Sequence, residues 1–174
     1  MGTITRSFAN LIGANGPTAL PSGVGGKVLQ VVSTIKTNSF SSSSTSYVDI
    51  TGLSLSITPS SASNKILVFA NIFSNSINGT IINFQLVRNS TAIAIGTDSR
   101  TYIGTVSNFI SSTTDENSTL TNSFNFYDSP STTSSTTYKV QVKNNTANAA
   151  TFINNRPAND YSFVSTITAM EIAG

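Results

Sequence analysis

The chain of 174 residues is long enough to bury one substantial core, yet only 9% of its residues are charged. Ser, Thr and Asn fill about two-fifths of the positions, well above ordinary usage. The absence of Cys and His excludes disulfides, the usual zinc sites and every catalytic triad that needs imidazole.

The net charge is +2, the balance of nine Lys and Arg residues and seven Asp and Glu residues. The Lys and Arg residues are scattered along the chain, and this pattern argues against a nucleic-acid surface. No run approaches the roughly 20 apolar residues of a membrane helix, and the start lacks the apolar core of a secretory signal. Hydrophobic residues make up 38% of the chain and occur in alternating runs, which argues against global disorder. We therefore expect a folded domain with a polar but weakly charged surface and no membrane insertion.

The first 26 residues differ in composition from the rest. Glycines and prolines crowd between Gly13 and Gly26 and break the segment too often for a helix or strand of normal length. We predict that residues 1–26 form an extended arm that docks on a partner. A flexible terminus is the commoner fate of such a segment and stays an alternative. The apolar residues expected to anchor the arm are Ile4, Phe8, Leu11 and Ile12.

From Lys27 onward the pattern predicts strands. The run Lys27–Ile35 is β-branched and apolar on both faces, and Asn38–Ser46 is predicted to be a hydroxyl-rich loop. Two further strands, YVDI and LSLSIT, come before a turn cluster at Pro59–Asn64.

The segment Lys65–Phe73 is the most informative of these strands. Ile66, Val68, Ala70 and Ile72 share one face, while apolar residues also occupy the opposite face. A strand that is apolar on both faces in an antiparallel protein predicts that its outer face is also covered. We expect the covering partner to be another subunit. The candidate interface residues are Leu67, Phe69 and Phe73.

The middle of the chain is rich in turn signals. Asn78-Gly79 predicts a two-residue hairpin, and Asn89-Ser90 predicts a second tight turn between INFQLVR and TAIAIG. A further strand is expected within Thr101–Ile110, followed by a polar loop at Ser111–Ser118. The acidic pair Asp115-Glu116 in that loop is best explained as a solvated turn rather than an ion site.

The stretch Ser123–Lys143 predicts a strand, a hydroxyl-rich loop and a second strand. Phe124 and Phe126 fall on one face of the first strand, and Tyr138, Val140 and Val142 fall on one face of the second. Between them, Asp128-Ser129-Pro130 breaks the pairing, because proline lacks an N–H and Asp128 is favoured in turns for local backbone bonding.

The chain closes with a short strand ATFIN, an irregular loop at Asn155–Ser162 and a last long strand from Phe163. About ten short strands with no helix predict an all-β, antiparallel, jelly-roll-like β-sandwich over residues 27–174, preceded by the arm of residues 1–26.

Several of these segments resemble the β domain of phage virion proteins, namely fibre and capsid-decoration proteins of phages of aquatic bacteria, including cyanophages. The residues that carry the resemblance are Asp128–Val142 (D-S-P-x-T… Y-K-V-Q-V), Ile153–Arg156 (I-N-x-R) and Thr168–Ile172 (T-x-x-E-I). The resemblance covers Lys27–Gly174.

The resemblance implies a homotrimeric, jelly-roll-like domain on the virion surface, made in the cytoplasm of the host bacterium. Its partners would be further copies of itself and other virion proteins such as the major capsid protein, with no cofactor. Long fibres of this kind carry an extended shaft that this sequence lacks. The resemblance therefore favours a capsid decoration (cement) protein or a short fibre protein, anchored by its arm.

Two other functions stay open. A tail-fibre module would bind host surface carbohydrate through the loops Ser41–Thr45, Ser111–Ser118 and Asn155–Ser162. Tyr102, Tyr127 and Tyr161 could stack on sugars, but buried-strand or interface positions explain them better. A glycan depolymerase would need a carboxylate pair from residues such as Asp98, Asp128 and Asp160. These residues are better explained by predicted turns, where Asp is favoured because it bonds to the local backbone. We expect no enzyme activity.

Overall fold

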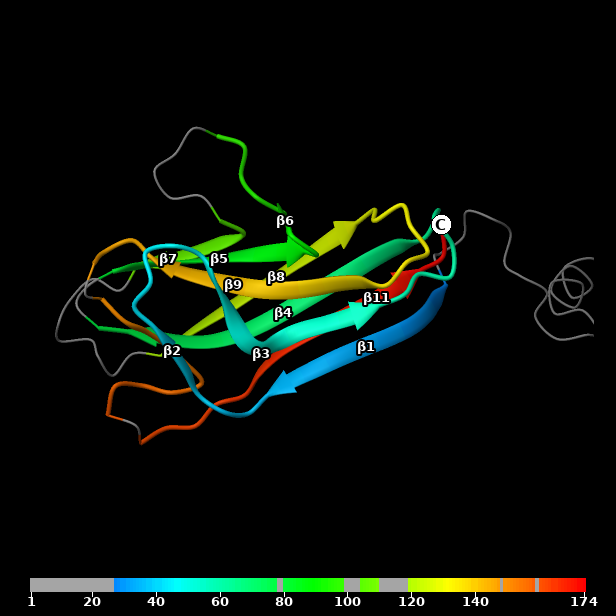
Figure 1. Cartoon of the computed structure of the whole chain (residues 1–174). Helices are drawn as coiled ribbons and strands as arrows, with labels where there is room; N and C mark the ends of the chain where they lie inside the picture. The colour runs from blue at the N-terminus through cyan, green and yellow to red at the C-terminus, as the bar shows by residue number, and fades with distance from the viewer. Residues whose placement is uncertain (1–26, 78–79, 99–103, 110–118, 148, 159) are drawn as a thin grey trace, which may run out of the picture.

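The computed structural model describes residues 27–77, 80–98, 104–109, 119–147, 149–158 and 160–174. These residues form two antiparallel β-sheets that face each other (Figure 1). Among them, no helix is long and apolar enough to cross a bilayer. The strands are β1 (Val28–Lys36), β2 (Phe40–Ser42), β3 (Val48–Ile57), β4 (Lys65–Ser76), β5 (Ile81–Arg88), β6 (Thr91–Ile93), β7 (Val106–Phe109), β8 (Leu120–Asp128), β9 (Thr136–Asn144), β10 (Thr151–Ile153) and β11 (Ser165–Ile172).

The first sheet, called sheet A here, is built around β4. This strand pairs on one side with β11 and, further along, with β10, and on its other side with β8. β1 pairs with β11 and β2 with β10, so these two strands lie at the edge opposite β8. The second sheet, sheet B, has the order β3-β9-β5, and β5 then pairs with both β6 and β7.

The long strands alternate between the two sheets along the chain. β1, β4, β8 and β11 belong to sheet A, while β3, β5 and β9 belong to sheet B. A six-stranded and a five-stranded sheet connected in this way form a jelly-roll-like sandwich, in which the chain repeatedly crosses from one sheet to the other. The predicted all-β, jelly-roll-like sandwich is therefore confirmed for the domain.

The predicted hairpin at Asn78-Gly79 is wrong. Its flanking strands, β4 and β5, lie in different sheets and do not pair with each other, although residues 78 and 79 themselves lie outside the described residues. β4 pairs instead with β8 and β11, and its inner face is buried in that arrangement. The turn at Asn89-Ser90 is confirmed: Asn89 has φ 54°, and Arg88 pairs with Thr91.

Three strand boundaries also differ from the prediction. The loop predicted at Asn38–Ser46 contains the short strand β2. The two strands predicted before Pro59 are one strand, β3, with an irregular register between Asp49 and Ser54, where Gly52 has φ 88°. The strand predicted over TAIAIG ends at Ile93, because Ala94 takes a left-handed conformation with φ 57°.

The core lies between the two sheets. Strand alternation sends every second side chain inward, as predicted for Ile66, Val68, Ala70 and Ile72 of β4, which are all buried. Sheet B contributes large buried side chains of its own, including Phe84 of β5 and Tyr138 of β9. Phe124 and Phe126 of β8 pack partly buried against this core. Burial of these inner faces is what holds the two layers together.

A buried polar contact joins the two sheets at the end of β8. Asp128 accepts two bonds from Arg88 Nη1, at 2.8 and 2.9 Å, and a bond of 2.6 Å from the Tyr138 hydroxyl. Burial and this contact with Asp128 raise the pKa of Tyr138 well above its usual value. Asp128 thus links sheet A to β5 and β9 of sheet B, and its predicted role in local backbone bonding is wrong.

A second buried carboxylate lies at the end of the domain near the C-terminus. Glu171 accepts bonds from Gln30 Nε2, from the backbone N–H and hydroxyl of Ser60, and from Asn64 Nδ2, at 2.5 to 2.8 Å. Burial raises the pKa of Glu171, but these bonds outweigh it and lower the pKa to about 2. The carboxylate therefore ties β1 and the turn after β3 to β11.

Amides and hydroxyls connect the strands at the opposite end of the sandwich. Asn144 Nδ2 donates to the Ser42 carbonyl at 2.9 Å, and Thr151 donates to Asn144 Oδ1 at 2.6 Å. Asn154, with φ 59°, donates to the Lys36 carbonyl at 2.7 Å and accepts from the Ser165 hydroxyl at 2.5 Å. The Asn of the I-N-x-R element is thus a structural residue that connects β1, β10 and β11.

The contact between Asp128 and Tyr138 predicts the effect of removing one hydroxyl. We expect Tyr138→Phe to lower the free energy of unfolding by about 1–3 kcal/mol, because the buried Asp128 carboxylate loses a donor. Urea unfolding at neutral pH measures this. Tyr127→Phe, at an exposed position on β8, is the matched control and should change stability by less than about 0.5 kcal/mol. Equal effects would contradict the role of the contact.

The bonds to Glu171 predict a dependence of stability on pH. The pKa of about 2 in the folded chain lies below the ordinary value of 4.5, so the stabilisation is complete above pH 4.5 and is lost as the pH falls toward 2. Glu171→Gln should destabilise the domain by about 1–3 kcal/mol at neutral pH, because an amide N–H would face other donors. Urea unfolding between pH 7 and 2 should show this deficit shrinking as the pH falls. A deficit that does not vary with pH would contradict the prediction. Ser54→Ala, at an exposed position without a titrating group, is the control.

Candidate assembly surface

The outer face of sheet A carries apolar side chains in register across four of its six strands, β1, β11, β4 and β8. Val31 lies opposite Met170, Met170 opposite Leu67, and Leu67 opposite Tyr127. Val31 and Tyr127 are 55% and 54% exposed. Because neighbouring strands lie about 4.8 Å apart, this row forms a continuous apolar band across the sheet. We call it the apolar row.

The three predicted interface residues lie on this outer face. Leu67 belongs to the apolar row, and Phe69 follows it on β4 with 39% of its surface exposed. Phe73 is half-buried, because its ring stacks on Phe163 with the centroids 5.4 Å apart. The structure therefore brings the three residues to one surface, and their role between subunits stays a prediction.

The two apolar faces of Lys27–Ile35 also predicted packing within and between subunits, and Val31 and Ile35 of the edge strand β1 lie on this surface. Sequence analysis missed the contributions of β11 and β8, namely Met170 and Tyr127. The positions of Met170 and Tyr127 beside Leu67 depend on strand register, which no local pattern reveals.

The outer face of sheet B is polar and internally bonded. Asp49 accepts from Lys139 Nζ at 2.8 Å and from Gln141 Nε2 at 2.7 Å, and Gln85 donates to Gln141 at 2.5 Å. The bond from Lys139 lowers the pKa of Asp49. Ser56 and Thr137 share a bond of 2.8 Å on the same face. Sheet B therefore presents a surface suited to water, whereas sheet A does not.

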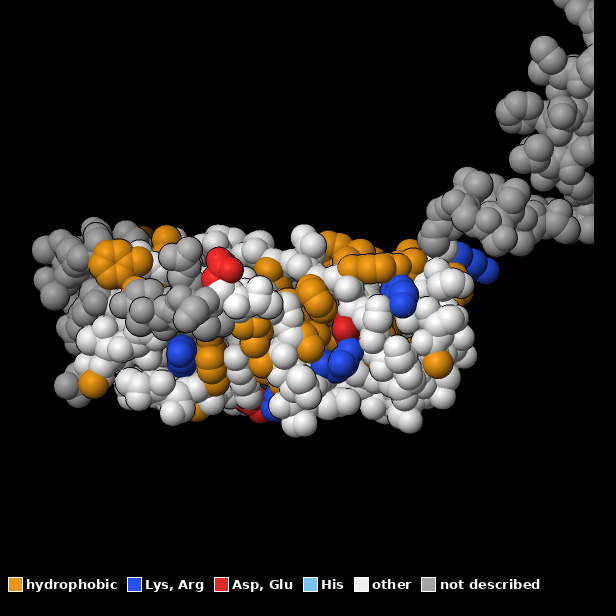
Figure 2. Space-filling view, turned by 90° about the horizontal axis from the view of Figure 1, so that it is seen from above, with side chains coloured by type: hydrophobic (Ala, Val, Ile, Leu, Met, Phe, Trp, Pro, Cys, Tyr) orange, Lys and Arg blue, Asp and Glu red, His pale blue; other side chains and the backbone are white. Residues whose placement is uncertain are grey.

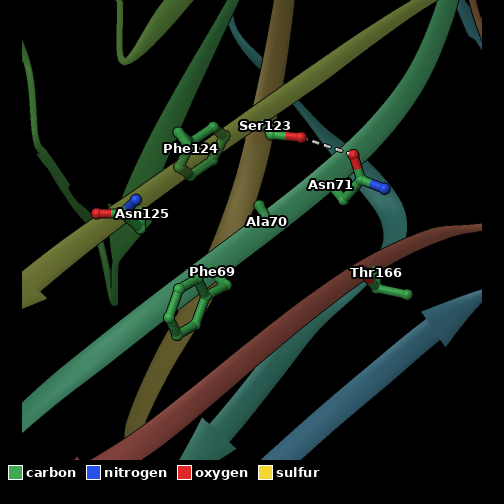
Figure 3. A pocket seen from close by; sticks show the side chains of 7 residues that line it. All are labelled: Phe69, Ala70, Asn71, Ser123, Phe124, Asn125 and Thr166. Carbon is green, nitrogen blue, oxygen red and sulfur yellow. Dashed lines mark hydrogen bonds between the residues drawn. The ribbon is translucent and has the colours of Figure 1, made fainter.

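A hollow lies on the outer face of sheet A beside Phe69. Its volume is about 260 Å³, and Figure 3 shows Phe69 and Asn71 of β4 around it together with Ser123 and Asn125 of β8. Thr166 of β11 closes the remaining side. The Ser123 hydroxyl donates to Asn71 Oδ1 at 2.8 Å, so these polar side chains already bond each other.

An aromatic group continues from this surface into the loop before β11. Phe163 stacks on Phe73 and, at 5.8 Å between centroids, on Tyr161. The guanidinium of Arg156 lies 4.3 Å from the centre of the Tyr161 ring and pairs with Asp160. Tyr161 is 52% exposed. Tyr127 and Tyr161 are therefore exposed and not buried within the chain, and their predicted alternative position at an interface stays a prediction. Tyr102 lies outside the described residues.

Two further predicted sites lie outside the described residues. They are the arm residues Ile4, Phe8, Leu11 and Ile12 and the acidic pair Asp115-Glu116. Within the described ranges, no group of three or more Asp or Glu residues is placed to hold a metal ion. On the face shown in Figure 2, uncharged polar groups predominate, with few charged side chains and hydrophobic ones scattered among them.

No protein-family model matches the chain, and no curated protein matches it significantly. Among solved structures, a chain in the structure of the infectious bursal disease virus Gx strain is similar to it, with a TM-score of 0.41 and 14% sequence identity. The match covers 84% of this chain and 43% of that chain. The present chain therefore spans less than half the length of that chain.

The exposed position of Phe69 predicts the effect of a charge on this surface. If the outer face of sheet A is buried between subunits, Phe69→Asp should convert an oligomer into a monomer at micromolar concentration, because burying an unpaired carboxylate costs several kcal/mol. Multi-angle light scattering on the purified chain measures the mass. Ser54→Asp, exposed on sheet B, introduces the same charge on the other sheet and should leave the mass unchanged. A native chain that is monomeric would refute the prediction.

Proposed function

We propose that this protein is a structural component of a bacteriophage virion, a homotrimeric capsid decoration (cement) or short fibre protein. The observation that carries the proposal is the contrast between the two outer faces: sheet B satisfies its polar side chains internally, while sheet A exposes the apolar row and Phe69. An exposed apolar sheet face of this kind marks a surface that another chain covers.

The resemblance of Asp128–Val142, Ile153–Arg156 and Thr168–Ile172 to phage virion proteins supports the same proposal, and the contacts of these residues explain why such a family would need them. Asp128 and Tyr138 connect the sheets, Asn154 connects three strands, and Glu171 holds the turn after β3. All are buried structural residues. The proposed role of these residues is therefore to stabilise the domain and not to catalyse a reaction.

The placement of the chain ends supports an orientation on the particle. The Ala173 N–H donates to the Lys27 carbonyl at 2.9 Å, so residues 1–26 join the domain at the same end as Gly174. Figure 1 places β2 and β7 at the opposite end. In the proposed arrangement the arm attaches the domain to a virion protein such as the major capsid protein, and the polar end points away from the particle.

A second candidate function is a tail-fibre module that binds host surface carbohydrate. The exposed Tyr161 ring, next to Arg156 and Asp160, combines an aromatic surface with charged hydrogen-bonding groups in the loop that we predicted to contact sugar. Binding of the purified chain to host cells, lost in Tyr161→Ala, would favour this function. Equal binding to cells stripped of surface glycan would argue against it.

The proposed anchoring role of the arm predicts the behaviour of a truncated chain. Removing residues 1–26 should leave a folded domain, because the described strands begin at Val28, and should abolish incorporation into particles. Circular dichroism checks the fold, and imaging of particles lacking the protein, after addition of either chain, measures occupancy. Occupancy equal to that of the full chain would show that the arm is not the anchor and would favour the second candidate function.

A further inference from the structure

The outer face of sheet A carries a projecting aromatic ring immediately beside a hollow. Phe69 stands at the centre of the sheet, on β4, with Thr168 and Asn125 as its neighbours on β11 and β8. The hollow begins at Phe69 and extends over the smaller side chains Ser123 and Thr166 (Figure 3). A projection and a recess therefore lie next to each other on the same surface.

The hollow is large enough to hold an aromatic side chain. Its volume is about 260 Å³, whereas a cavity of about 150 Å³ in a protein core can hold benzene. Its polar lining is uncharged, and Asn71 and Ser123 already satisfy each other across 2.8 Å. A phenyl ring entering the hollow would therefore displace water without leaving a charged group unpaired.

We propose that Phe69 of one copy of this chain inserts into the hollow beside Phe69 of a neighbouring copy, so that the outer faces of sheet A form the interface between subunits. This inference rests on the proposed homotrimer and adds to it the surface and the residue that enters the neighbour. In a homotrimer each Phe69 would enter the hollow of the next copy around the threefold axis, so the contact is not reciprocal between two copies. Phe69 is the central contact, and the apolar row extends the interface along the sheet.

Charge favours a second copy as the occupant of this face. The residues of β4, β8 and β11 that surround Phe69, including Asn71, Asn125 and Thr168, are uncharged. Two identical surfaces meet without repulsion only when they carry no net charge, whereas a partner selected by charge would need complementary groups here. Because projection and recess lie on one face, every copy supplies both.

The size of the face agrees with this occupant. The four strands β1, β11, β4 and β8 have 9, 8, 12 and 9 residues, and at about 3.3 Å per residue and about 4.8 Å per strand they give a flat area of about 600 Å². A stable protein–protein interface of standard size buries about 800 Å² per partner. Sheet A therefore offers most of the area that a specific contact between two copies requires.

The test replaces Phe69 by the photoreactive analogue p-azidophenylalanine in the full-length chain, which keeps the ring. Isotopically heavy and light chains are mixed and irradiated, and mass spectrometry then distinguishes cross-links between copies from those within one copy. We expect heavy–light cross-links to the peptide around Ser123–Asn125 or to that around Thr166. Cross-links between copies that map to other surfaces, or to residues 1–26, would overturn the inference.

Two variants test the same contact without a photoprobe. Ser123→Trp fills the hollow and leaves Phe69 intact, while Phe69→Ala removes the ring and leaves the hollow. Each should raise the dissociation constant of the oligomer at least 10-fold, as measured by analytical ultracentrifugation. Ser54→Trp on sheet B is the control for an added indole, and circular dichroism checks that each variant is folded.

The outcomes separate this inference from the proposed function. If the native chain is an oligomer and both variants associate as tightly as it does, another surface joins the subunits; the inference then fails while the virion role stands. If the native chain is monomeric at micromolar concentration, both the inference and the proposed homotrimer fail.

Discussion

The structure depends on burying the inner faces of two sheets whose strands alternate along the chain. Each strand can place only half of its side chains in the core, so every strand also presents an outer face. In sheet B the outer side chains are amides, hydroxyls and a few charges that bond to one another. In sheet A the outer face exposes the apolar row and Phe69, beside polar side chains such as Asn71 and Thr168. This asymmetry makes one side of the sandwich a candidate for assembly.

The few charged groups that are buried act as connectors between strands. Asp128 joins the two sheets through Arg88 and Tyr138, and Glu171 joins β11 to β1 and to the turn after β3. Elsewhere Asn144 and Asn154 bond directly to backbone carbonyls. The neutral amides and hydroxyls around Asn144 and Asn154 do not titrate, so their bonds are independent of pH, whereas the bonds to Glu171 depend on its ionisation.

An uncharged surface also bears on how copies of the chain would meet. Net charge keeps many proteins apart, and a surface dominated by Ser, Thr and Asn lacks that repulsion. Phe69 and the apolar row could then approach an identical surface at little electrostatic cost. The same property would let many copies lie close together on a particle, which is what a decoration or fibre protein requires.

The sequence by itself determined the all-β class, the inward and outward faces of most strands and the apolar outer face of Lys65–Phe73, because these follow from alternation within a single strand. It also determined the turn at Asn89, which depends on local conformation. Only the tertiary structure decided that β4 and β5 lie in different sheets despite Asn78-Gly79, since β4 gains more by pairing with β8 and β11 than a local turn can supply. The tertiary structure also decided the role of Asp128 and the hollow beside Phe69. It likewise decided the alignment of Val31, Met170, Leu67 and Tyr127. Each of them joins residues far apart in the chain through a register that no local pattern encodes.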